Sequence, residues 1–151
     1  MAEYGPLTRQ MFERAFGLAQ QAAASGEVPV GALLVKDEQI IAEAHNQIIA
    51  LHDPTAHAEL LAVRQAARIL GNERLVGCEL YSTLEPCTMC SGALLMARVE
   101  AVHVLAYEER LPAMRQVQQL SGHNHQIAFT RYQMPEFDVA ALLSNFFQNK
   151  R

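Results

Sequence analysis

A histidine and two cysteines near the middle of the chain carry side chains that can bind a metal ion. His57 stands two positions before a carboxylate, Glu59, and both fall where a helix is expected to begin. Further along the chain, Cys87 and Cys90 directly follow Pro86 in a Cys-x-x-Cys pattern. Because imidazole nitrogen and thiolate sulfur are ligands that zinc prefers, these residues predict a zinc site made of His57, Cys87 and Cys90.

The number of ligands bears on what such a site would do. Structural zinc sites fill all four positions with protein side chains, whereas catalytic sites leave one position for water. The remaining cysteine, Cys78, is a poor fourth ligand because it is expected at the far end of the strand that leads to Cys87. We interpret it as a small buried hydrophobic residue. An open position lowers the pKa of the water to about 7, and Glu59 is close enough to carry protons, which indicates metal-assisted hydrolysis.

Each motif has a more ordinary interpretation when it is taken alone. A Cys-x-x-Cys pair is often a redox pair or one half of a zinc ribbon, and a single histidine at a helix start is often a cap. The sequence holds three cysteines and no second Cys-x-x-Cys, which argues against a ribbon and against a secreted disulfide framework. A redox pair would leave His57 and Glu59 without a role. The combination therefore favours the metal site.

Two helix starts have to deliver these side chains. Pro86 suits the first turn of a helix because its missing N–H would have no partner there. Cys87 and Cys90 are spaced i, i+3, so their sulfurs share one helical face, and a helix N-terminus favours the thiolate form. The hydrophobic pattern predicts helices that begin near Thr8 and Pro135 and helices over 56–70, 86–98 and 112–120, with strands over 28–35, 40–44, 78–83, 99–107 and 126–131.

The alternation of strands with helices predicts an α/β fold. Its sheet should be mixed, largely parallel and covered by helices on both faces. In such sheets, sites form where strands end and helices begin, which is where both motifs fall. The length of 151 residues fits a single domain over 1–151.

Charge and hydropathy exclude several classes of protein. The formal net charge is -4, and the Lys and Arg residues are scattered singly apart from Lys150-Arg151. This excludes a globally basic nucleic-acid-binding protein, although not a local basic patch. The first residues have neither the basic nor the apolar region of a signal peptide, and no apolar run is long enough to span a bilayer. We expect a cytoplasmic protein without a membrane partner.

Longer runs around the two motifs resemble a known family. The pattern H-x-E followed by P-C-x-x-C is the signature of zinc-dependent nucleobase deaminases. The similarity runs from about Glu27 to Arg98 and resumes weakly at 124–125 and 142–147. The runs Glu27–Ala32, His52–Glu59 and Leu84–Ala93, together with Asn46, resemble the bacterial tRNA-specific adenosine deaminases within the cytidine and deoxycytidylate deaminase family.

The resemblance implies a fold, an activity and a set of site residues. The fold would be cytidine-deaminase-like, a three-layer α/β/α sandwich with a mixed five-stranded sheet, and the protein a homodimer. The substrate would be a tRNA anticodon stem-loop, whose wobble adenosine becomes inosine. The resemblance also implies zinc as the cofactor, with His57, Cys87 and Cys90 as metal ligands, Glu59 as the catalytic proton shuttle, and Asn46, Ala58 (through its backbone N–H) and Val28 as substrate contacts.

The helix expected around Met89–Ala97 supports the homodimer. Its apolar residues, Ala93 to Met96, extend too far round the helix for a single buried stripe. Such a helix is buried on more than one side, here by a second subunit.

One segment departs from the resemblance. Where the family usually has a Gly-Ala-Arg-Asp run followed by Lys-Thr-Gly-Ala, which lies against the tRNA, this chain reads Leu105–Pro112 with Tyr107, Glu108 and Glu109. Added carboxylates repel phosphate, whose contacts dominate nucleic-acid affinity. The segment 105–122 thus favours a small substrate, whereas the runs around the motifs favour tRNA.

Three functions remain open at this point. The first is conversion of adenosine to inosine in tRNA. The second is deamination of a free nucleobase or nucleoside, of the guanine, cytosine or adenine type. The third is a non-enzymatic zinc-binding dimerisation module, against which Glu59 argues because a carboxylate beside a metal is costly if no chemistry uses it.

Overall fold

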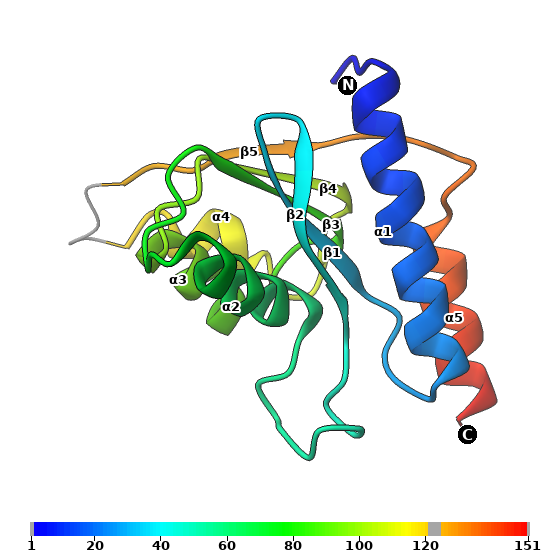
Figure 1. The fold of residues 1–151 in the computed structure, drawn as a ribbon. Coiled ribbons are helices and arrows are strands. Elements are labelled where there is room, and N and C mark those ends of the chain that lie inside the picture. Colours follow the sequence, from blue (N-terminus) through cyan, green and yellow to red (C-terminus); the bar gives the residue numbers. More distant parts are fainter. Residues whose placement is uncertain (1, 121–124, 151) are drawn as a thin grey trace.

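The structure is a computed structural model that describes residues 2–120 and 125–150 (Figure 1). Residue 124 of the weaker resemblance and residues 121–122 of the divergent segment lie outside this description. Within the described part, the elements in chain order are α1 (Pro6–Ala24), β1 (Gly31–Lys36), β2 (Gln39–His45), α2 (Ala58–Leu70), β3 (Cys78–Leu84), α3 (Thr88–Met96), β4 (Ala101–Ala106), α4 (Ala113–Val117), β5 (Ala128–Arg131) and α5 (Val139–Asn149).

The strands form one mixed sheet of five in the order β2-β1-β3-β4-β5. β1 pairs antiparallel with both β2 and β3, whereas β3 with β4 and β4 with β5 are parallel. The expected mixed sheet is confirmed, but the expectation that it would be largely parallel is wrong, because half of the pairings are antiparallel. The hairpin turn after Lys36 reverses β2, and the chain returns through α2 into β3 against the direction of β1.

Helices cover both faces of the sheet, which gives the expected three-layer α/β/α sandwich (Figure 1). One core cluster joins α2, α3 and α4 to one face, and the other joins α1 and the start of α5 to the opposite face. β1 contributes to both clusters, since Ala32 and Leu34 face α2 and α3 while Leu33 and Val35 face α1. This double burial explains why its sequence is a continuous apolar run.

Several elements begin later or end earlier than the sequence pattern predicts. α3 begins at Thr88 because Cys87 is its N-cap residue with extended backbone. α4 is only five residues long, in place of the expected 112–120. α5 begins at Val139, where the Asp138 carboxylate accepts a hydrogen bond from the Ala141 N–H at 2.9 Å. Among the described residues, no helix combines the length and apolar character needed to cross a membrane.

Gly31 marks the closest approach between the sheet and α1. A Cβ atom at this position would lie 2.1 Å from the carbonyl oxygen of Ala15 and 2.8 Å from the backbone nitrogen of Ala19. Both are helix backbone atoms, which cannot move aside as a flexible side chain would. The packing of α1 on β1 therefore requires glycine here.

We expect Gly31→Ala to lower the free energy of unfolding by about 3 kcal/mol, because α1 has to move away from β1. Gly17 in α1 is the matched control, since a Cβ there meets no atom within 4 Å. Gly17→Ala should raise the free energy of unfolding by up to about 1 kcal/mol through helix propensity. Urea denaturation measures both. Equal unfolding midpoints for the two variants would contradict this account of the packing.

Candidate active site

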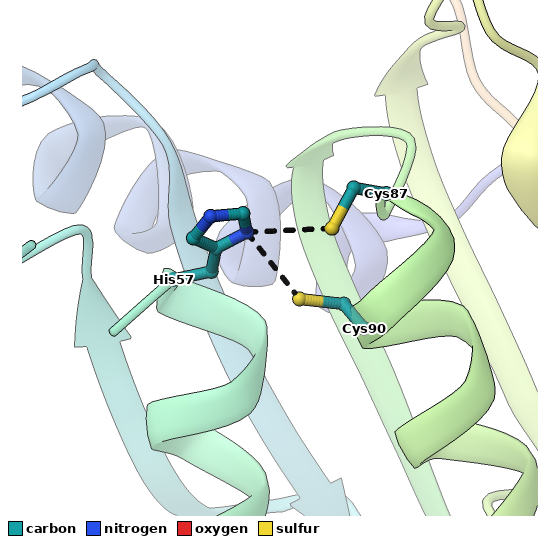
Figure 2. A group of neighbouring side chains, drawn as sticks. All are labelled: His57, Cys87 and Cys90. Atoms are coloured by element: carbon teal, nitrogen blue, oxygen red, sulfur yellow. Dashed lines mark hydrogen bonds between the residues drawn. The ribbon is translucent and has the colours of Figure 1, made fainter. Parts of the chain in front are cut away.

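The first turns of α2 and α3 bring the predicted metal ligands together (Figure 2). His57 is the N-cap residue of α2 and Cys87 that of α3. The Nδ1 atom of His57 lies 3.4 Å from the Cys87 Sγ and 3.6 Å from the Cys90 Sγ. Two residues from different strand-to-helix junctions and one from the first turn of α3 thus converge on one point.

The three donor atoms fit a single zinc ion. All of them lie within 4.8 Å of one another. Neighbouring ligands of a tetrahedral zinc stand roughly 3.5 Å apart, given metal–ligand distances of about 2.0–2.3 Å. The two measured separations from His57 match this spacing, and one imidazole with two sulfurs is a donor set that zinc prefers.

The charges of the same three groups also suit a cation. The pKa of Cys87 is lowered to about 4, because the Cys90 thiol donates a hydrogen bond to its sulfur and His57 adds to the effect. The pKa of Cys90 is raised for the same reason, since its proton is held between the two sulfurs. The hydrogen bond to Cys87 in turn raises the pKa of His57. A bound divalent metal would remove the remaining thiol proton and neutralise both sulfurs.

Glu59 lies in the first turn of α2 and is 4% exposed. Burial raises the pKa of its carboxyl group to about 7. Glu59 is outside the group of residues placed to hold a metal, but it lines the same cavity as His57 and Cys87. A carboxyl group in this place can exchange protons with a molecule in the cavity without binding the metal.

The cavity beside His57 and Cys87 measures about 500 Å³. Val28 and Asn46, two of the predicted substrate contacts, lie in its wall. The third, Ala58, is buried, and its N–H donates to the Asn46 Oδ1 at 2.8 Å. Asn46 therefore satisfies a backbone donor at the start of α2, and the contact of the Ala58 N–H with a base stays a prediction.

Two buried glutamates near the cavity escaped the sequence analysis. The Glu27 carboxylate accepts hydrogen bonds from the backbone N–H groups of Ile49 and Ala50, which hold the loop after β2. The Glu85 carboxylate accepts one from the Glu108 N–H in the divergent segment. Both acids lie in otherwise apolar runs close to a proline, at Glu27-Val28-Pro29 and Leu84-Glu85-Pro86. That placement was the available signal for a buried structural carboxylate.

Residues 7–106 match the family model described as the cytidine and deoxycytidylate deaminase zinc-binding region. The match covers more than half of the chain and includes all three metal-site residues. The chain belongs to this deaminase family. It is therefore a hydrolytic deaminase with zinc as its cofactor, and His57, Cys87 and Cys90 are the group in the structure placed to hold the metal.

Individual relatives within the deaminase family include enzymes of two kinds. The tRNA-specific adenosine deaminase of Aquifex aeolicus is 44% identical over 136 residues, which cover 88% of this chain and 89% of the relative. A solved tRNA:A34 deaminase is 36% identical with a TM-score of 0.79, covering 82% of this chain and 98% of that chain. The guanine deaminase of Bacillus subtilis is 34% identical with a TM-score of 0.65, covering 94% of this chain and 92% of that chain.

The metal ligands can be tested with the three cysteines of this deaminase. We expect Cys87→Ser and Cys90→Ser to lose most of their zinc, because each removes one of three protein ligands. Cys78→Ala is the control: Cys78 is fully buried at the start of β3, and the variant should keep about one zinc per chain. Elemental analysis of the purified proteins measures this. Full zinc in both serine variants would show that the ligands lie elsewhere.

Proposed function

We propose that this chain converts adenosine to inosine at the wobble position of a tRNA anticodon. The observation that carries the proposal is the similarity to tRNA-specific adenosine deaminases, which extends over most of both chains and exceeds that to the guanine deaminase in identity and in TM-score. In this proposal, residues 1–151 form a single deaminase domain that acts in the cytoplasm. Three free thiols in the described residues suit a reducing compartment.

The cavity supports a substrate whose base is turned out of an RNA loop. Enzymes that act on a base within a nucleic acid extrude it into a pocket and read its edge by hydrogen bonds. Val28 would contact the ring from the wall of the cavity. The Asn46 oxygen is engaged by the Ala58 N–H, so the amide NH₂ is the Asn46 group left to donate to an acceptor on the base.

His57, Cys87 and Cys90 would hold the zinc, and Glu59 would move the protons. When bound with one position open, zinc supplies a water whose pKa is lowered to about 7. Glu59 would accept a proton from the attacking water and pass it to the ring nitrogen beside C6. It would then take the proton of the new hydroxyl group at C6 and give it to the amino group, as the bond between C6 and the amino nitrogen breaks. Water is consumed, ammonia leaves, and the base carries oxygen in place of the amine.

A homodimer is part of the proposal, and the surface of α3 supports it. Met96 is 71% exposed and Met89 is 37% exposed, and both lie on the largely apolar helix α3. Met89, Ala93 and Met96 are spaced so that they fall along one side of the helix. A second subunit would cover this apolar stripe.

Deamination of a free base remains a second candidate because of two observations. A guanine deaminase shares this fold at 34% identity. In addition, the Glu108 side chain lines the cavity, where a carboxylate would repel a nearby phosphate. Arg110 stands next to it with its side chain 90% exposed and supplies an opposite charge at the same edge. Membership of the deaminase family gives no support to the non-enzymatic module.

We expect an anticodon stem-loop to be deaminated and free guanine, cytosine, adenine and adenosine to be poor substrates. Because RNA binding depends on phosphate contacts, kcat/KM on the stem-loop should fall about tenfold between 50 and 200 mM salt if about two phosphates are contacted. Ammonia release measures the turnover of both substrate classes. Free guanine carries no phosphate, so whatever turnover it shows at the two salt concentrations is the matched control. Efficient turnover of a free base with none on the stem-loop would select the second candidate.

A further inference from the structure

We propose that Glu85 and Arg115 are positioning residues that hold the segment 107–111 as one wall of the active-site cavity, and that this wall helps to select the substrate. The part of the proposal that concerns the substrate rests on the proposed function. The part that concerns the wall does not, because it follows from contacts among the described residues. Glu108, Arg110 and Leu111 of this segment all line the cavity.

Glu85 connects the metal site to this segment. Its side chain is fully buried, directly before Pro86 and the metal-site residue Cys87. Its Oε1 accepts hydrogen bonds from the Glu108 N–H at 3.0 Å and from the Arg115 guanidinium at 2.8 Å. A third, from the Arg115 Nε to Oε2, measures 3.3 Å. One carboxylate therefore binds both ends of the stretch from Glu108 to Arg115.

Arg115 is held by its own helix and by Tyr107. Ala113, Met114 and Val117 of α4 are buried, and Met114 and Val117 belong to the core cluster, so α4 has a fixed place. The Arg115 guanidinium carbon lies 4.2 Å from the centre of the Tyr107 ring, a cation–π contact. Tyr107, the first residue of the segment 107–111, therefore contacts the same guanidinium that pairs with Glu85.

The energetics of burial make this arrangement more than a surface ion pair. A buried carboxylate that loses its charged partner is strongly unfavourable, so the groups around it rearrange or take up water. Without Arg115, Glu85 would keep only the Glu108 N–H of these three donors. Tyr107 would lose the nearer of the two guanidinium groups over its ring and keep that of Arg131 at 5.2 Å. The wall of the cavity would then no longer have a single position, and a substrate that contacts it would bind less well.

The experiment compares Arg115→Ala, Arg115→Lys and the control Arg74→Ala, which removes an exposed arginine from the loop before β3. In Arg115→Ala, hydrogen exchange of the amides of 107–111 should speed up about tenfold while core amides of β3 and β4 do not change. On the stem-loop, KM should rise about tenfold with kcat changed little, because the wall binds substrate rather than the reacting atoms. Zinc content should stay at about one per chain.

Arg115→Lys keeps the charge but loses the fork of two N–H donors, and it should fall between Arg115→Ala and the wild type. The same measurements can be made on Arg115→Lys if Arg115→Ala does not fold. If a folded Arg115 variant shows unchanged hydrogen exchange over 107–111, Glu85 and Arg115 do not hold this segment. The same conclusion follows if exchange speeds up by an equal factor throughout the core. Faster exchange over 107–111 without a change in KM would show that the wall does not help to select the substrate. If the wild type does not act on the stem-loop at all, the proposed function fails. The exchange data still decide whether Glu85 and Arg115 hold the segment 107–111.

Discussion

The separation between the first turns of α2 and α3 is the constraint on which the rest of the structure depends. His57 and Cys87 come from different junctions, yet their donor atoms lie 3.4 Å apart. Buried polar side chains hold the loops that surround them, because Glu27, Asn46 and Glu85 each accept hydrogen bonds from backbone N–H groups of a neighbouring segment. These contacts satisfy donors that the sheet and helices leave free, and so the loops around the cavity have a defined place.

The proposed chemistry depends on a predicted metal ligand and an acid that lie at the start of one helix. His57 points its Nδ1 at the two sulfurs (Figure 2). Glu59, two positions later, lines the cavity and stands outside the metal group. Holding both on a rigid element would fix the distance between a metal on His57 and Glu59, the proposed proton carrier. The proposed wall of 107–111 belongs to a different segment, so its residues can change while the metal-site residues stay the same.

The sequence predicts this site well and the surrounding fold less well, for physical reasons. Cys87 and Cys90 were predictable as a pair because residues three positions apart at a helix start share one face, whereas His57 was joined to them by the combination of the two motifs. The antiparallel pairing of β1 with β3 was not, because a period of two residues carries no information about strand direction. Glu85 and Arg115 pair across thirty positions of sequence, and only the folded chain shows that the acid is buried. The Tyr107-Glu108-Glu109 run indicated repulsion of phosphate, but in the structure Arg115 and Arg131 lie over the Tyr107 ring.

The central claim is that Glu59 moves protons for a reaction at the adjacent metal. The most direct measurement compares zinc content and turnover in Glu59→Gln, which keeps the size and removes the acid. We expect about one zinc per chain, as in the wild type. We also expect a fall in kcat of about 10²–10⁴-fold, the range in which general acid–base catalysis contributes. A Glu59→Gln protein with wild-type turnover would contradict the account, and so would one that loses activity only because it has lost its zinc.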